Sequence, residues 1–360
     1  MNRSPFLERS ARALRAREAK MRRRRRRRVT AAAMLAILAG AAAVFALSRS
    51  AATHGSASVS RGARGQARRA ALRTPTRSRL GLALGRPPLE LDLSASGDPV
   101  RVSFRHPPRA GLLFDLDSGR VLWRREATRA LPIASLAKMM TALLVVRSRP
   151  SGAEVAITRD AVDASGSKVG LLPLHKHVLL KTLLYGLLLP SGNDAAIALA
   201  EAVAGSVHAF VERMNVEAAR LGLACTRYTS PDGLDNGNSS CAADLAELAA
   251  ADLAQPRIAA AARSASAVLP FPIKGGKLYL YNNNPLLRYG YPGTTGLKTG
   301  ETEAAGLCLV GTAEREGVRL GVVLLHSPEL GRQAEYLLDR GFEDVYGQPH
   351  LAAPPIPAGR

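Results

Sequence analysis

Apolar residues follow two different spacings along this 360-residue chain, and the two spacings occupy different regions. Residues 138–253 are rich in Ala and Leu at helical spacing, which predicts a series of helices. Short runs typical of strands precede and follow this region, at 112–115, 120–123, 278–281, 307–310 and 320–325. Asp117-Ser118-Gly119 separates the first two runs and predicts a hairpin turn. A final helical pattern covers about 329–342, and the separation of strands from helices predicts an α+β fold rather than an alternating parallel one.

The N-terminal pattern is that of a membrane anchor. Arg22–Arg28 is an unbroken arginine block, and residues 29–47 form an uncharged apolar run long enough to cross a bilayer as a helix. The positive-inside rule places residues 1–28 in the cytoplasm and the C-terminal domain outside. We therefore expect a single-pass protein of the cell membrane with an extracytoplasmic domain. A cleavable signal peptide is the alternative, and the length of the apolar run favours an uncleaved transmembrane helix.

The chain's positive charge lies almost entirely before the C-terminal domain. Residues 1–109 hold 25 Lys and Arg against 5 Asp and Glu, whereas residues 110–360 hold 25 against 24. The domain is therefore near neutral, and no nucleic-acid partner is implied.

Two segments have the composition of disordered chain. Residues 48–108 are rich in Ser, Gly, Ala and Arg and predict a basic linker, and residues 348–360 predict a disordered tail. The linker is expected to be a solvated tether, with binding to anionic lipid or acidic wall polymers as the alternative.

Three short motifs carry the chemistry: Ser135-Leu-Ala-Lys138, Ser191-Gly-Asn193 and Lys298-Thr-Gly300. Ser135 and Lys138 are three residues apart, so on the helix predicted to begin near Ser135 they share one face. A serine in a first helical turn lies beside free backbone N–H groups that stabilise a developing oxyanion. Burial and a second cation both lower a lysine's pKa, and Lys298 is the candidate for that cation.

The other motifs supply polar groups from a turn and a strand. Ser191 and Asn193 lie in a tight turn between two apolar stretches, where they either project into a cleft or cap the next helix. Lys298-Thr299-Gly300 precedes a strand-like run and either receives a substrate carboxylate or protects a sheet edge. A decoy, Ser165-Gly-Ser-Lys168, also fits the first pattern, but its glycine and the nearby Gly170 favour a loop.

Longer segments around these motifs resemble the low-molecular-mass penicillin-binding proteins, the serine-type D-alanyl-D-alanine carboxypeptidases. The resemblance covers about residues 109–347, the expected catalytic domain, and rests on the following segments: 134–142, 189–196, 210–215, 231–234, 296–302, 305–306 and 331–335. It implies an antiparallel sheet flanked by helices, with an all-helical lobe between the first and third motifs. It also implies removal of the terminal D-alanine from peptidoglycan stem peptides, with β-lactam antibiotics as inhibitors and no cofactor.

The resemblance assigns a role to each motif residue. Ser135 is the implied nucleophile, Lys138 its general base, and Ser191 the relay that protonates the leaving D-alanine. Asn193 holds the acyl-chain amide, while Lys298 and Thr299 beside Gly300 receive the terminal carboxylate. The remaining implied contacts are the backbone N–H of Glu301, as an oxyanion donor, and Arg332, as a second carboxylate contact or merely a surface charge.

Glu301 departs from the family pattern, and an acid at this position is expected to weaken binding of anionic substrates. Three alternatives remain: a β-lactamase, a transpeptidase of the same superfamily, or a non-catalytic anchored wall-binding protein. The chain shows no convincing glutamate loop for a β-lactamase, and the intact motifs argue against a relic site.

The three cysteines and seven histidines add little chemistry. Cys308 lies in a strand-like run and is interpreted as a packed thiol. Cys225 and Cys241 either form a disulfide outside the membrane or remain free, because the sequence does not give their separation. His175 and His177 lack a third ligand, so no metal site is implied.

Overall fold

The computed structural model describes residues 77–170, 172–273 and 275–349. A five-stranded antiparallel sheet has the strand order β2-β1-β11-β10-β9. Its strands are β1 (Ala110–Asp115), β2 (Val121–Arg125), β9 (Thr294–Thr302), β10 (Gly306–Arg315) and β11 (Val318–Leu325). The first and last parts of the domain therefore form one sheet, which confirms the α+β prediction.

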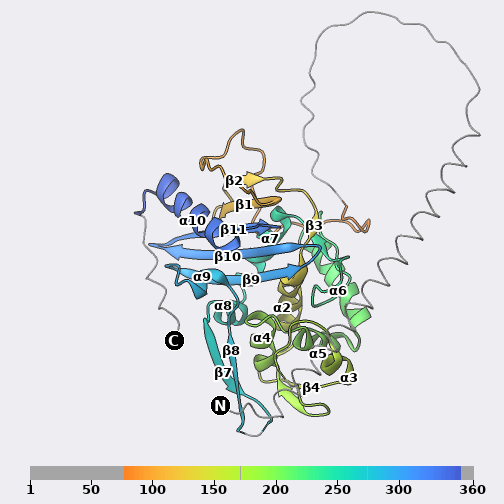
Figure 1. Cartoon of the computed structure of the whole chain (residues 1–360). Coiled ribbons are helices and arrows are strands. Elements are labelled where there is room, and N and C mark those ends of the chain that lie inside the picture. The colour runs from red at the N-terminus through yellow and green to blue at the C-terminus, as the bar shows by residue number, and fades with distance from the viewer. Residues whose placement is uncertain (1–76, 171, 274, 350–360) are drawn as a thin grey trace, which may run out of the picture. The chain divides into compact units, whose positions relative to one another are not determined.

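The remaining elements are helices and three small two-stranded sheets (Figure 1). The helices are α2 (Ala137–Ser148), α3 (Arg159–Asp163), α4 (Leu180–Leu188), α5 (Asn193–Ala204), α6 (Val207–Arg220), α7 (Ala242–Leu253), α8 (Pro256–Ala262), α9 (Pro285–Arg288) and α10 (Leu330–Tyr346). The small sheets pair β3 (Leu131–Pro132) with β6 (Ser239–Ser240), β4 (Glu154–Ala156) with β5 (His177–Leu179), and β7 (Ser266–Pro270) with β8 (Lys277–Tyr281).

Successive side chains along a strand point to opposite faces of a sheet, and both faces of this large sheet are buried. Leu112 and Phe114 of β1 belong to the larger apolar core, which the helical lobe covers. Leu113, between them, belongs to a second core that includes Leu338 and Phe342 of α10. Because both faces are buried, the apolar residues are continuous along these strands instead of alternating with polar ones.

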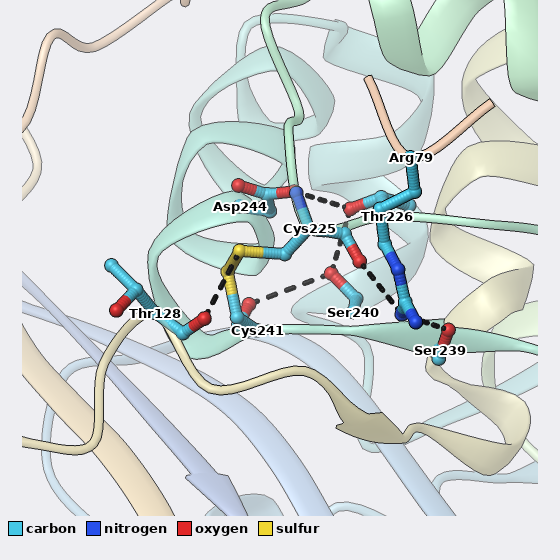
Figure 2. The surroundings of a disulfide bond; sticks show 8 residues. All are labelled: Arg79, Thr128, Cys225, Thr226, Ser239, Ser240, Cys241 and Asp244. Carbon is cyan, nitrogen blue, oxygen red and sulfur yellow. Dashed lines mark hydrogen bonds between the residues drawn. A yellow bond between two sulfur atoms is a disulfide. The ribbon is translucent and has the colours of Figure 1, made fainter. Parts of the chain in front are cut away.

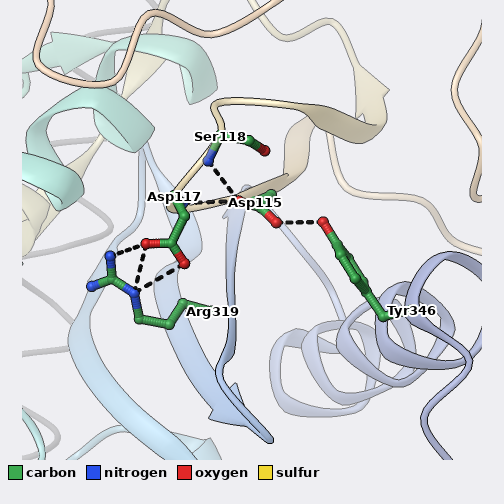
Figure 3. Close-up of polar contacts among 5 residues, drawn as sticks. All are labelled: Asp115, Asp117, Ser118, Arg319 and Tyr346. Carbon is green, nitrogen blue, oxygen red and sulfur yellow. Dashed lines mark hydrogen bonds and ion pairs between the residues drawn. The ribbon is translucent and has the colours of Figure 1, made fainter.

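The predicted hairpin between β1 and β2 is confirmed, and Figure 3 shows how its turn is held. The Asp115 carboxylate accepts hydrogen bonds from the backbone N–H groups of Asp117 and Ser118, at 2.8 and 2.7 Å. Its other oxygen accepts a bond from the Tyr346 hydroxyl at the end of α10. Asp117 pairs with Arg319 of β11. The turn thus joins two inner strands of the sheet, β1 and β11, to α10, which packs on one of its faces.

The expectation of a disordered linker is wrong for residues 77–108. Leu89, Leu91 and Leu93 pack against the larger core, and Val100 is only 1% exposed. The buried Glu247 carboxylate accepts hydrogen bonds from the backbone N–H groups of Leu89 and Leu91, at 2.7 and 3.0 Å. A short alternation of leucines with polar residues directs these side chains to one side, a signal that average composition conceals.

The predictions for residues 1–76 and 350–360 fall outside the described residues, and these include the transmembrane helix at 29–47. Within the described part of the chain, no single helix is long and apolar enough to span a membrane. Only α5 and α6 taken together meet that test, with an 83° bend between them.

Candidate active site

Ser135 lies in a 3-10 turn, Ala134–Leu136, that leads directly into the buried helix α2. Ala134 adopts a left-handed backbone with a φ of 49°, which turns the chain sharply before the helix. Leu136 and the residues that follow are buried, so the turn is held by the core while Ser135 itself lines a cavity. The helix predicted to begin near Ser135 is thereby confirmed.

Lys138 is fully buried one helical turn after Ser135, and its ammonium nitrogen contacts three oxygens. Nζ lies 2.9 Å from Ser135 Oγ, 2.6 Å from Asn193 Oδ1 and 2.6 Å from the backbone carbonyl oxygen of Asp232. Burial lowers the pKa of Lys138 to about 7, although the nearby carboxylates of Asp232 and Asp194 act in the opposite direction. A large neutral fraction of the amine therefore exists at neutral pH.

The carbonyl of Asp232 reaches Lys138 because its loop packs directly on the nucleophile turn. Thr141 of α2 donates a hydrogen bond to the carbonyl of Pro231 at 2.6 Å. A Cβ on Gly233 would lie 2.0 Å from the Ala134 carbonyl oxygen, so only glycine fits there. Sequence reasoning missed Asp232 as a site residue, since its contribution is a backbone oxygen.

A disulfide closes the segment that carries this loop (Figure 2). Cys225 and Cys241 are bonded, with their Cα atoms 5.7 Å apart, which resolves the two alternatives left by the sequence. Cys225 N and the Thr226 hydroxyl both donate to the buried carboxylate of Asp244, at 2.8 and 2.6 Å. Arg79, from the segment predicted to be a linker, donates to Ser239 Oγ at 2.9 Å. Cys308 is free and buried, as predicted.

Ser191 and Asn193 lie at the start of α5. Ser191 has a φ of 66°, and its buried hydroxyl has no hydrogen-bond partner among the described residues. Asn193 accepts from Lys138 and donates through Nδ2 to the Ser165 carbonyl at 2.6 Å. The turn therefore projects both side chains inward, as one of its two interpretations required.

The rejected Ser165–Lys168 pair is a loop beside this turn. The Lys168 ammonium is bonded to the Val162 carbonyl at 2.6 Å rather than to a serine hydroxyl. The loop is instead fastened by Asp194, whose carboxylate accepts the Val169 N–H at 2.9 Å. Sequence reasoning gave Asp194 no role, and its burial is what raises the pKa of its carboxyl.

The third motif lies on β9, the edge strand of the large sheet. Lys298 is buried, and its ammonium donates to the Thr299 carbonyl at 2.8 Å. Burial first, and then the charge of Lys138, lower the pKa of Lys298 well below its usual range. A Cβ on Gly300 would lie 2.8 Å from the Ile133 carbonyl oxygen and 3.1 Å from Ser135 N. Glycine at this position therefore lets the strand lie against the nucleophile turn.

A cavity of about 1000 Å³ brings the three motifs together. Of the predicted site residues, Ser135, Ser191, Thr299, Gly300, Glu301 and Arg332 line it. Lys138, Asn193 and Lys298 lie buried behind that lining. The structure adds lining residues that the sequence did not single out: Ser167, Asn283, Pro285, Arg288, Tyr289, Leu307, Pro328, Glu329, Leu330, Gly331 and Glu335. They come from loops, from α9, from the start of β10 and from the first turns of α10, and of them only Gly331 and Glu335 lie in a segment on which the family resemblance rests.

The site combines a serine hydroxyl, a buried lysine amine in contact with it, and a strand edge that faces the same cavity. This is the arrangement of a serine acyl-transfer enzyme. Comparison with known proteins agrees with this class. The family of D-alanyl-D-alanine carboxypeptidases, peptidase S11, matches residues 103–329. The chain belongs to this family of serine-type peptidases.

Individual relatives support the same assignment. The chain is 32% identical over 265 residues to the carboxypeptidase DacF of Bacillus subtilis, covering 71% of this chain and 67% of DacF. It is 36% identical over 245 residues to DacB2 of Mycobacterium tuberculosis, covering 66% of this chain and 82% of DacB2.

Solved structures extend the similarity to the fold. A D-alanyl-D-alanine carboxypeptidase from M. tuberculosis matches with a TM-score of 0.63 and 34% identity, covering 71% of this chain and 95% of that one. The DD-transpeptidase of Streptomyces K15 matches with a TM-score of 0.63 and 29% identity, covering 67% of this chain and 99% of that one.

Proposed function

We propose that this enzyme removes the terminal D-alanine from peptidoglycan stem peptides through an acyl-enzyme on Ser135. The observation that carries the assignment is the position of Lys138 Nζ, in contact with three oxygens of which only one is a hydroxyl. In the neutral amine, two N–H groups donate to Asn193 Oδ1 and the Asp232 carbonyl. The lone pair is then left facing Ser135 Oγ, as a general base requires.

Acylation follows from this arrangement. Ser135 Oγ attacks the carbonyl carbon of the penultimate D-alanine while its proton passes to Lys138 Nζ. The negative charge that forms on the carbonyl oxygen faces the N–H groups of Ser135 and Glu301, where the nucleophile turn and β9 meet. The C–N bond then breaks, and the leaving amine takes a proton relayed through the Ser191 hydroxyl.

Positively charged and hydroxyl groups account for recognition of the C-terminus. Thr299 and Arg332 line the cavity from β9 and α10 and would contact the terminal carboxylate. Lys298 is buried behind Thr299, and its amine donates to the Thr299 carbonyl, which positions this part of β9 beside the cavity. Asn193 Nδ2 would exchange its Ser165 partner for the acyl-chain amide, or share the two. Water completes the cycle by hydrolysing the ester and returning the proton to Ser135.

Two rival activities use the same nucleophile. A class A β-lactamase needs a separate glutamate to deacylate. Among the described residues between Asn193 and Lys298, those lining the cavity include no acid. Transfer to a second peptide is closer chemically, and the Streptomyces K15 neighbour is named a DD-transpeptidase. The same acyl-enzyme serves both outcomes, and hydrolysis is the one that most relatives' names support.

We also propose that the enzyme works outside the cell membrane, attached through residues 29–47. The arginine block before that apolar run supports a cytoplasmic N-terminus. The disulfide supports an oxidising compartment. Extraction of the full chain from membranes by detergent but not by high salt would agree with this placement, and release by salt alone would contradict it.

Intact-protein mass measurement after brief exposure to benzylpenicillin tests the acyl-enzyme. We expect a persistent single adduct on the full chain and none on Ser135→Ala. Release of D-alanine from a pentapeptide ending in D-Ala-D-Ala should be lost in the same variant. Rapid destruction of the drug without an adduct would indicate a β-lactamase instead. Intact drug without an adduct would indicate a non-catalytic protein.

A further inference from the structure

The β7–β8 hairpin presents an apolar and aromatic face to solvent. Leu269 and Leu280 point into the larger core, and the alternation of the strands places Val268, Tyr279 and Tyr281 on the opposite face. These three side chains are 55%, 60% and 68% exposed. Val268 lies directly opposite Tyr279 in the register. The hairpin runs beside α4 of the helical lobe in Figure 1, with α8 and α9 near its base.

This face is continuous with the active-site cavity. Tyr281 lines a second cavity of about 420 Å³, together with Asn283, Leu287 and Arg288. Asn283 and Arg288 also line the cavity that contains Ser135, so the two cavities share a wall. The second cavity lies within the range of about 300–1,000 Å³ that is usual for small-molecule pockets.

The shared wall is fixed in place next to the proton-relay serine. Asn283 N donates to the Leu189 carbonyl at 3.1 Å, and Asn283 Nδ2 donates to the Pro190 carbonyl at 3.2 Å. Both acceptors immediately precede Ser191. Arg288 is exposed at the end of α9 and has no ion-pair partner among the described residues. The second cavity, with Tyr281 at its side, therefore adjoins the turn that carries Ser191.

We propose that the second cavity and the tyrosine face bind the sugar strand to which the stem peptide is attached. This inference rests on the proposed function, because it assumes a peptidoglycan substrate. Tyrosine rings pack against the C–H faces of pyranose rings, while their hydroxyls remain free for hydrogen bonds. Asn283 and Arg288 are suited to the hydroxyl and amide oxygens of amino sugars. The hairpin thereby extends recognition from the peptide to its carrier.

A glycan fits this surface better than a protein partner does. The face is two strands wide and its aromatic residues carry hydroxyls, so it offers a narrow amphipathic strip rather than a broad apolar patch. A protein bound over Tyr281 would cover the cavity that joins the reaction cleft. A sugar strand could lie there while its own peptide occupies that cleft.

The test compares one pentapeptide in two forms, free in solution and carried on uncross-linked glycan strands, with the full-length enzyme. We expect Tyr281→Ala to raise KM for the glycan-borne form about five- to tenfold with kcat unchanged. It should alter kcat/KM for the free peptide less than twofold. Tyr281→Phe keeps the ring and should retain most of the glycan preference. Ile273→Ala, an exposed apolar residue at the hairpin's tip, is the matched control and should change neither.

The outcomes separate this inference from the proposed function. Equal effects on both substrate forms, or no effect on either, would overturn the glycan subsite. Absence of D-alanine release from both forms by the unmodified enzyme would instead overturn the proposed function. The rate of acylation by benzylpenicillin reports that each variant is folded. If Tyr281→Ala loses that activity, Tyr279→Ala tests the same face.

Discussion

The state of Lys138 decides whether this site reacts. Two of its contacts are to oxygens that only accept hydrogen bonds, the amide oxygen of Asn193 and the carbonyl of Asp232. Only the third partner, Ser135, has a proton to give. The geometry therefore fixes the direction of proton transfer once the amine is neutral, and burial provides that neutral form.

Acylation by benzylpenicillin should depend on pH with a midpoint near 7, the pKa of Lys138. Below the midpoint the neutral base is lost, so the rate should fall about tenfold per pH unit. Above it the rate should level off. Lys138→Arg should be inactive throughout, because a guanidinium stays protonated. Stopped-flow measurement of acylation from pH 5 to 9 checks this, and a flat profile would exclude Lys138 as the base.

Gly300→Ala should slow acylation about 100-fold without unfolding the protein, because displacing the groups around a reaction by about an ångström has effects of this size. The added methyl group would press on the Ile133 carbonyl and the Ser135 amide, at 2.8 and 3.1 Å. Gly152→Ala is the control, since a Cβ there meets nothing within 4 Å. Benzylpenicillin acylation rates, measured beside thermal unfolding, separate misplacement from instability. Unchanged acylation in Gly300→Ala would show that β9 can shift to accommodate the methyl group without displacing Ser135.

At the scale of elements, the nucleophile turn is held between two segments distant in sequence. β9 packs against it from one side through Gly300, and the loop with Asp232 packs against it from another through Gly233. The loop is anchored at its ends by the disulfide, and β6 pairs with β3 just before the turn. The disulfide therefore supports the site without lining it.

Replacing both Cys225 and Cys241 by serine should lower the free energy of unfolding by about 3 kcal/mol, the value expected for a closed loop of this length. Acylation should slow as well, because the Asp232 carbonyl loses part of its support. Dithiothreitol provides the control: it should destabilise the unmodified enzyme to the level of the double variant and leave the variant unchanged. Equal denaturation midpoints for the two proteins without reductant would contradict this role.

The sequence predicts these elements to different degrees. The hairpin and the helix after Ser135 are confirmed, since local periodicity and turn residues determine both. The strand that carries Lys298 has no such periodicity, and only the family resemblance indicated it. Asp232, Asn283 and Arg288 were missed because tertiary packing alone brings their loops to the cavity. The long-range pairing of β1 with β11 likewise has no local signal: the prediction was one sheet with strands from both ends of the domain, without a strand order.

At the scale of the whole molecule, the catalytic domain begins earlier than its motifs suggest. The family match starts at residue 103, yet residues 89–93 already pack on the core, and Arg79 already contacts the segment closed by the disulfide. Low average hydropathy made this segment resemble a linker. Its few leucines matter because they lie on one side and cover helix α7, where the backbone N–H groups of Leu89 and Leu91 bind the Glu247 carboxylate.

A fragment that starts at Arg109 should therefore be less stable than one that starts at Arg77. Burial of Val100 alone contributes about 1.5–3 kcal/mol, so loss of the whole segment should remove at least about 3 kcal/mol. For a domain of this size that lowers Tm by roughly 6–12 °C. Differential scanning calorimetry of the two fragments measures the difference.

Glu247→Leu distinguishes packing by this segment from a general effect of length. In the longer fragment it removes the acceptor for the N–H groups of Leu89 and Leu91 and should destabilise. In the shorter fragment the Glu247 carboxylate is uncovered and hydrated, so the substitution should change stability by less than about 0.5 kcal/mol there. Destabilisation of the longer fragment alone would place residues 77–108 within the catalytic domain, and equal effects in both fragments would indicate a tether that does not pack on α7.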